Sequence, residues 1–274
     1  MKLRFVISTL FVLLFSGCES VLNLNIFQAI DSPAKLDLSK LSTSNLEELE
    51  NRADSASFFN QLRTQPEARK VVTDKLQAVM TSASSTDAEK TRSAALFIEV
   101  QSQGTSAHSA VNNIFSTLFP LISSDAGIAI LSGNPEGMKN TLVGLMGSNE
   151  SEVAETLEAL SSISDALNLL SSLNAIDAKL GGDVIQASIL GAVSYAVVSS
   201  ATGATLAEKA KGVASIATAA DPSLLFDQVF ANGALDAKLV DIGSAISTPA
   251  TYTGDFGYVK DLLTLVPTKT GATL

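Results

Sequence analysis

Cysteine, histidine and tryptophan are nearly missing from this chain of 274 residues, which contains one cysteine, one histidine and no tryptophan. A single cysteine cannot form a disulfide within the chain or a zinc site built from several thiolates. A single histidine leaves carboxylates as the main candidates for metal ligands, and we expect no metal ion and no cofactor. The apolar core must therefore suffice to hold the fold, and 46% of the residues are hydrophobic.

Positive charge is also scarce in this chain. Lys and Arg together number 18, against 28 Asp and Glu, which gives a formal net charge of −10 at pH 7. No basic cluster interrupts this excess of acids. Binding of nucleic acid depends on neutralising its phosphates, so we expect no nucleic-acid partner. The same excess argues against docking to anionic lipid by charge.

The N-terminal residues have the three parts of a secretory signal. Lys2 and Arg4 supply positive charge, Phe5–Phe15 is mostly apolar, and the small pair Ser16-Gly17 stands immediately before Cys18. The apolar run is too short for an ordinary membrane-spanning helix. We therefore predict that residues 1–17 are a signal peptide.

The tetrapeptide Phe15-Ser16-Gly17-Cys18 resembles the lipobox of bacterial lipoproteins, although Phe15 stands where that motif usually has an aliphatic residue. The resemblance implies that the Cys18 thiol accepts diacylglycerol and that the chain is then cleaved between Gly17 and Cys18. The mature chain would have no free thiol and no cysteine nucleophile. A plain secretory signal with an incidental cysteine is the alternative, but the only cysteine of the chain lies at the cleavage point, which favours the lipobox.

The resemblance also implies a destination. Glu19 follows the cysteine, and it is not the aspartate that retains lipoproteins in the inner membrane of enteric bacteria. We therefore expect a bacterial cell-envelope protein that is bound to a membrane through its diacylglyceryl cysteine. The periplasmic side of the outer membrane is favoured over the inner membrane, although the sorting rule differs between lineages.

We divide the chain into three parts: a signal peptide (1–17), a lipidated N-terminus and tether (18–43), and a helical domain (44–274). Within the tether, Val21–Phe27 alternates apolar and polar residues, as a short strand or an extended segment lying on the domain would. The tether is not rich in Gly and Ser, so we expect the domain to stay close to the membrane surface.

Signals for helices recur throughout the predicted helical domain. The apolar positions between Val153 and Leu180 fall three or four residues apart, which is the most regular helical pattern in the chain. The expected fold is all-α, an irregular bundle of about nine to eleven helices. A degenerate helical-repeat array is the alternative, because Ala175–Leu180 closely resembles Ala234–Leu239, but no sustained period accompanies this match.

Pro120 is expected to interrupt or kink a helix of about residues 106–118. Capping boxes or first-turn prolines stand at Ser44-Asn45-Leu46-Glu47, Pro66, Thr86-Asp87-Ala88-Glu89, Pro135 and Thr205-Leu206-Ala207-Glu208.

The stretch Val184–Ala207 contains no charged residue and is long enough to span a bilayer. Several Ser and Thr residues and two Gly dilute its apolar character. Small residues such as Gly191 would let neighbouring helices approach closely. We therefore interpret the stretch as a buried core helix, with a membrane span as the alternative.

Residues with catalytic potential are few. A Ser-His-Asp triad would have to use His108, but no nucleophile-elbow motif accompanies it, and we interpret it as solvent-facing or adjacent to a helix cap. The acids concentrate near predicted helix starts, where they interact favourably with the helix dipole and stay solvated. These acids are Glu47, Glu48, Glu50, Glu150, Glu152, Glu155 and Glu158.

Two short matches to signatures of penicillin-binding proteins and β-lactamases also occur. Ser32-Pro33-Ala34-Lys35 fits S-x-x-K, and Lys269-Thr270-Gly271 fits K-T-G. One lies before the predicted helices and the other in the last residues of the chain, and the S-D-N element is missing. We attribute both matches to chance.

These observations favour a non-catalytic, lipid-anchored envelope protein that binds a protein partner or a small ligand through a helical surface or groove. A carrier that holds an apolar ligand in an internal helical cavity is the first alternative. A hydrolase with an unrecognised site, built from Ser and Lys or from paired carboxylates, is the second.

Overall fold

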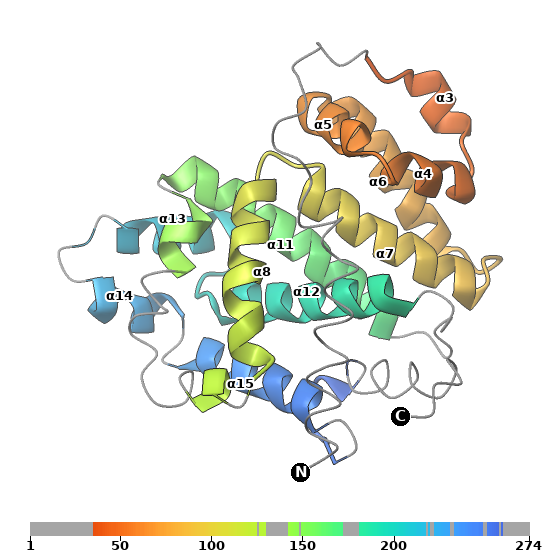
Figure 1. The fold of residues 1–274 in the computed structure, drawn as a ribbon. Helices are drawn as coiled ribbons and strands as arrows, with labels where there is room; N and C mark the ends of the chain where they lie inside the picture. The colour runs from red at the N-terminus through yellow and green to blue at the C-terminus, as the bar shows by residue number, and fades with distance from the viewer. Residues whose placement is uncertain are drawn as a thin grey trace.

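The computed structural model describes residues 35–124, 126–129, 142–147, 149–171, 181–217, 219, 222–230, 233–248, 251–257 and 259. All regular secondary structure in these residues is helical, which confirms the predicted all-α fold. The predicted segment Val21–Phe27 and the helix start at Pro135 lie outside these ranges. The main helices (Figure 1) are α3 (Leu38–Thr43), α4 (Leu46–Ala53), α5 (Ala56–Thr64), α6 (Pro66–Thr81), α7 (Asp87–Gln103), α8 (His108–Ile122), α11 (Glu150–Ser171), α12 (Gly181–Ser200), α13 (Leu206–Ala217), α14 (Pro222–Val229) and α15 (Ala234–Ser247).

Two long helices, α11 and α12, form the centre of the bundle. Helix α11 packs against α7, α8, α12 and α13, and α12 also packs against α7, α8 and α15. Figure 1 shows α3–α6 at one end of the molecule and α14 and α15 at the opposite end. In a repeat array each unit contacts only its neighbours, so this branching set of contacts identifies an irregular bundle.

Helix α11 carries the most regular apolar pattern in the chain. Val153, Leu157, Leu160, Ile163 and Leu167 are all buried. Their spacing of three or four residues places them on one face, as the sequence predicts. The rest of the predicted run, residues 172–180, lies outside the described residues.

The uncharged stretch Val184–Ala207 corresponds largely to helix α12. Most of its residues from Ala187 to Ser200 are buried in the bundle, so the interpretation as a core helix is confirmed. The helix begins at Gly181, directly after the last position of the apolar run that the sequence places between Val153 and Leu180. It ends at Ser200, before Gly203, whose φ of 128° is in the region that glycine tolerates best. In the described part of the chain, no helix combines the length and apolar character needed to cross a bilayer.

The local signals for helix starts are mostly correct. The predicted capping box between Thr86 and Glu89 is present, and Thr205 and Glu208 make the same two hydrogen bonds. The first box is shifted by one residue: Asn45 caps α4 and pairs with Glu48. The reason is that Ser44, the predicted cap, donates its hydroxyl at 2.8 Å to the Lys40 carbonyl at the end of α3.

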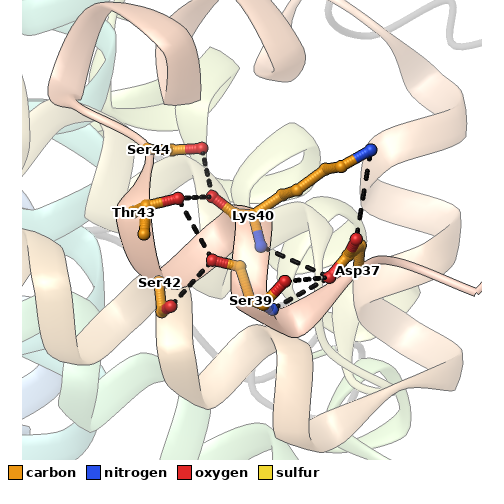
Figure 2. A network of polar contacts seen from close by, with 6 residues as sticks. All are labelled: Asp37, Ser39, Lys40, Ser42, Thr43 and Ser44. Atoms are coloured by element: carbon orange, nitrogen blue, oxygen red, sulfur yellow. Dashed lines mark hydrogen bonds and ion pairs between the residues drawn. The ribbon is translucent and has the colours of Figure 1, made fainter.

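The helical domain begins earlier than residue 44. Helix α3 lies within the range that the sequence assigned to the tether, and its Leu41 is completely buried. Asp37 caps this helix by accepting hydrogen bonds from the backbone N–H groups of Ser39 and Lys40 (Figure 2). The hydrogen bond from the Ser39 hydroxyl is the main cause that lowers the pKa of Asp37. Such a short helix has little intrinsic stability, so burial of Leu41 decides its formation.

Pro120 neither ends α8 nor separates it into two parts. The helix continues to Ile122, which is completely buried. Pro120 lies in the last turn and has no N–H to donate to the Ser116 carbonyl, but the helix continues past it, and the backbone N–H of Ser123 donates to the Phe119 carbonyl at 3.0 Å.

We expect Ser194→Ala to stabilise the protein. Ser194 on α12 is 0% exposed, and its hydroxyl has no hydrogen-bond partner among the described residues. An unpaired buried hydroxyl costs about 1–3 kcal/mol, so the alanine variant should gain about 1 kcal/mol in urea denaturation. Thr156→Val is the contrasting variant, because the Thr156 hydroxyl donates at 2.9 Å to the carbonyls of both Met146 and Glu152. It should lose stability, and a loss of similar size in both variants would contradict the prediction.

Candidate functional site

The residues for which the sequence predicts lipidation and cleavage, Cys18 and Gly17, lie outside the described residues. Ser32 and Lys269-Thr270-Gly271 also lie outside the described residues, so the distance between the two short signature matches is not described. Lys35 is the first described residue and is exposed.

His108 is the first residue of α8 and is half-buried. Its Nδ1 lies 3.2 Å from the Thr105 carbonyl oxygen, which makes Nδ1–H the donor, and its Nε2 lies 3.2 Å from Ser109 Oγ. Burial, followed by the nearby Arg63, lowers the pKa of His108. The neutral ring can therefore accept the Ser109 hydroxyl proton, but within the described chain no carboxylate is bonded to the ring. A backbone carbonyl stands where a triad would have its acid.

The acidic residues near helix starts have mainly structural roles. Glu48 belongs to the cap of α4, and Glu155 of α11 accepts a hydrogen bond of 2.6 Å from the Ser106 hydroxyl. Glu50 differs from the prediction of a solvated acid, because both of its carboxylate oxygens accept hydrogen bonds from Arg92 of α7. No group of three His, Cys, Asp or Glu side chains in the described ranges is arranged to hold a metal ion.

The C-terminal end of α7 is held by two arginines that belong to other helices. Arg63 of α5 donates from Nε to the Gln103 carbonyl at 2.6 Å, and Arg69 of α6 donates from Nη1 to the Gly104 carbonyl at 3.1 Å. The last turn of α7 has no basic residue of its own. Cations from neighbouring helices therefore satisfy its terminal carbonyls and the negative end of its dipole.

The C-terminal end of α12 is held in the same way by two lysines. Lys209 of α13 donates to the Val198 carbonyl at 2.7 Å, and Lys238 of α15 donates to the Ser199 hydroxyl at 2.7 Å. The Lys238 ammonium also lies 5.3 Å from the centre of the Tyr195 ring, which is within the range of a cation–π contact. We call Tyr195, Ser199, Lys209 and Lys238 the α12 end cluster.

The α12 end cluster contains the pairing of serine and lysine that hydrolases can use. Burial, followed by the charge of Lys209, lowers the pKa of Lys238, which favours the neutral amine that a general base requires. In the geometry observed, however, Lys238 donates to Ser199, and the Ser199 hydroxyl donates to the carbonyl of Tyr195. The arrangement acts as a helix cap, and attack by Ser199 would require the bond to Tyr195 to break first.

Tyr252 links the C-terminal segment 251–257 to helix α15. Its hydroxyl donates to the Asp241 carboxylate at 2.7 Å and accepts from the backbone N–H of Phe256 at 2.9 Å. Burial is the main cause that raises the pKa of Tyr252 well above its usual range, and Asp241 acts in the same direction. The phenol thus joins two chain segments as a neutral donor and acceptor.

We expect Tyr252→Phe to destabilise the protein by about 1–2 kcal/mol at neutral pH, since both hydrogen bonds are lost. The effect should depend on pH in a defined direction. An unfolded tyrosine ionises near pH 10, and the folded pKa of Tyr252 is higher, so its contribution is complete below about pH 10 and falls as the pH rises further, by at most about 1.4 kcal/mol per pH unit. Urea denaturation of both proteins from pH 8 to 11 measures this, and a constant difference above pH 10 would contradict it.

The sequence alone did not reveal either arginine–α7 contact or the α12 end cluster. The partners in these contacts are separated by many residues, such as Arg63 and Gln103. One weak signal was available: α7 and α12 end without a basic residue in their last turn, so their carbonyls require partners from elsewhere.

Comparisons of the chain with protein-family models, with curated proteins and with solved structures found no match.

Proposed function

We propose that the chain is a lipid-anchored, non-catalytic protein of the bacterial cell envelope that binds a protein partner or a small ligand through the surface of its helical domain. The observation that carries the proposal is the position of Cys18. It is the only cysteine, and it directly follows the small pair Ser16-Gly17 at the end of a signal-like segment. Glu19 favours the periplasmic side of the outer membrane.

The position of the first helices is consistent with such an anchor. The backbone N–H of Leu36 donates to the side chain of Gln65 at 2.9 Å, and Leu41 is in the core. The chain is therefore part of the folded domain from Leu36 onward. The segment between Cys18 and Leu36 can act as the connection between a lipid and the domain.

The contacts of four basic side chains are explained without assigning them a catalytic role. Arg63, Arg69, Lys209 and Lys238 all donate to groups at helix ends. Their role is therefore explained by the stability of the bundle. No catalytic step is needed to account for the positions of these four side chains.

The proposal is tested by isolating the acylated protein from its native membrane in mild detergent, followed by mass spectrometry of the proteins and lipids that accompany it. We expect a specific envelope protein or a small ligand in constant proportion. The Cys18→Ser chain, purified in parallel, shows which companions depend on the anchor. A stoichiometric lipid without any specific protein would favour the carrier of an apolar ligand instead.

A hydrolase is the second candidate, because of the 2.7 Å contact between Ser199 and Lys238. A serine-directed fluorophosphonate probe distinguishes it from the non-catalytic proposal, which predicts no labelling. Labelling that is lost in Ser199→Ala but kept in Ser109→Ala would assign a nucleophile to the α12 end cluster. Loss in Ser109→Ala alone would assign it to the residue beside His108.

A further inference from the structure

The point at which the folded domain meets the N-terminal segment is well defined. Leu36 is bonded to Gln65, which lies at the junction of α5 and α6, and Asp37 caps α3 immediately afterwards. Polar contacts within α3 run from Asp37 at its start to Ser44 at its end (Figure 2), and Lys75 of α6 donates to the Ser42 carbonyl.

Two large apolar side chains are exposed among the described residues, one on α3 at an end of the molecule and the other on the central helix α12. Leu38 of α3 is 43% exposed and Tyr195 of α12 is 37% exposed. Leu38 stands close in sequence to Lys35, which is exposed, and to Lys40, whose side chain is 75% exposed and whose ammonium lies 4.0 Å from the Asp37 carboxylate. An apolar side chain flanked by lysines is suited to the boundary between water and anionic lipid.

Charge is distributed unevenly between the two ends of the domain. Residues 35–103, which form α3–α7, contain nine Lys or Arg and ten Asp or Glu. Residues 104–274 contain seven and sixteen. The net charge of the chain opposes contact with anionic lipid, but most of it belongs to the second part: −9 on residues 104–274, against −1 on residues 35–103 and −2 from Glu19 and Asp31. The end that carries α3 is close to neutral.

We propose that the α3 end of the domain, with Leu38 and the ammonium groups of Lys35 and Lys40, lies against the lipid surface, while the more acidic part of the chain, residues 104–274, lies farther from it. This inference rests on the proposed anchor at Cys18. Fully extended, the chain between Cys18 and Leu36 spans at most about 60 Å, which would also allow other orientations. The uneven charge and the exposed Leu38 select one of them.

The absence of tryptophan and the single cysteine make the orientation measurable. The mature chain, residues 18–274, is coupled through the Cys18 thiol to a maleimide phospholipid in vesicles of three parts phosphatidylcholine and one part phosphatidylglycerol. Leu38→Trp and Tyr195→Trp each place a single tryptophan at an exposed site. With brominated acyl chains in the vesicles, we expect the fluorescence of Leu38→Trp to fall by at least half and that of Tyr195→Trp to stay within about a tenth of its value.

Chemical coupling separates this test from the proposed function, because the domain is anchored whether or not cells acylate Cys18. Circular dichroism of both variants confirms that the helical fold is retained. At 1 M salt charge interactions are screened, and the difference between the two variants should decrease. Equal quenching of both tryptophans, stronger quenching at position 195, or no quenching at position 38 would each overturn the proposed orientation.

Discussion

Replacement of Cys18 by serine is expected to abolish lipid attachment and to leave residues 1–17 on the chain. A serine hydroxyl does not accept diacylglycerol in place of the thiol, and by the lipobox resemblance cleavage follows lipid attachment. Cys18 is the only cysteine, so no other thiol can substitute for it. In a bacterial host supplied with labelled fatty acid, the wild-type chain should carry label and the Cys18→Ser chain should carry none. The variant should also migrate as the larger precursor.

Ser20→Ala is the matched control for this experiment, since it changes a hydroxyl close to the cleavage point and leaves the tetrapeptide Phe15-Ser16-Gly17-Cys18 intact. It should be labelled and processed like the wild type. If Cys18→Ser is processed normally to the mature length, the segment is a plain secretory signal and the anchor proposal fails.

Replacement of Gly191 by alanine should destabilise the bundle by about 2 kcal/mol, because it overpacks the contact between its two central helices. A Cβ atom at Gly191 of α12 would lie 2.8 Å from Cβ and 2.9 Å from Cδ1 of Leu167 on α11. The Cβ of Leu167 is fixed to the backbone, so a rotation of the leucine side chain cannot relieve the clash. The two helices would have to move apart, which weakens the packing of α11 and α12 along their length.

Gly212→Ala provides a control with the same chemical change. Gly212 lies inside α13, and a Cβ there would meet the methyl groups of Val229 at 3.6 and 3.7 Å, which are ordinary contact distances. Alanine is favoured over glycine in a helix by about 1 kcal/mol, so this variant should be more stable than the wild type. Urea midpoints measured at an unchanged m-value compare the two directly. An increase in stability for both variants would show that α11 and α12 are less tightly packed than we infer.

Much of the helical structure is predictable because its determinants are local. The capping box of α7 joins Thr86 and Glu89, which are three residues apart, and the chain itself brings them together. The apolar spacing of α11 likewise places Val153 and Leu157 on one face in any fold. Such contacts form with the helix and do not depend on the position of its neighbours.

The predicted helix boundaries were wrong where contacts between residues far apart in the sequence determined the local structure. Helix α3 has six residues and lies within the predicted tether, yet it forms because Leu41 enters the core and Lys75 of α6 donates to the Ser42 carbonyl at 2.6 Å. The presence of α3 moved the cap of α4 from Ser44 to Asn45. Helix α8 continues past Pro120 to the buried Ile122, so the predicted interruption is wrong.

The sequence by itself determined the all-α class, most helix starts and the buried character of α12, because spacing along the chain defines each helix face and each cap. It also determined the position of the only cysteine, on which the proposed anchor depends. Only the tertiary structure decided which helices pack together and which basic side chains bind the C-terminal end of another helix, such as Arg63 at α7 and Lys209 at α12. The physical reason is that Ala-, Ser- and Leu-rich faces can pack in many arrangements, and the choice among them follows from shape complementarity over the whole core, as at Gly191.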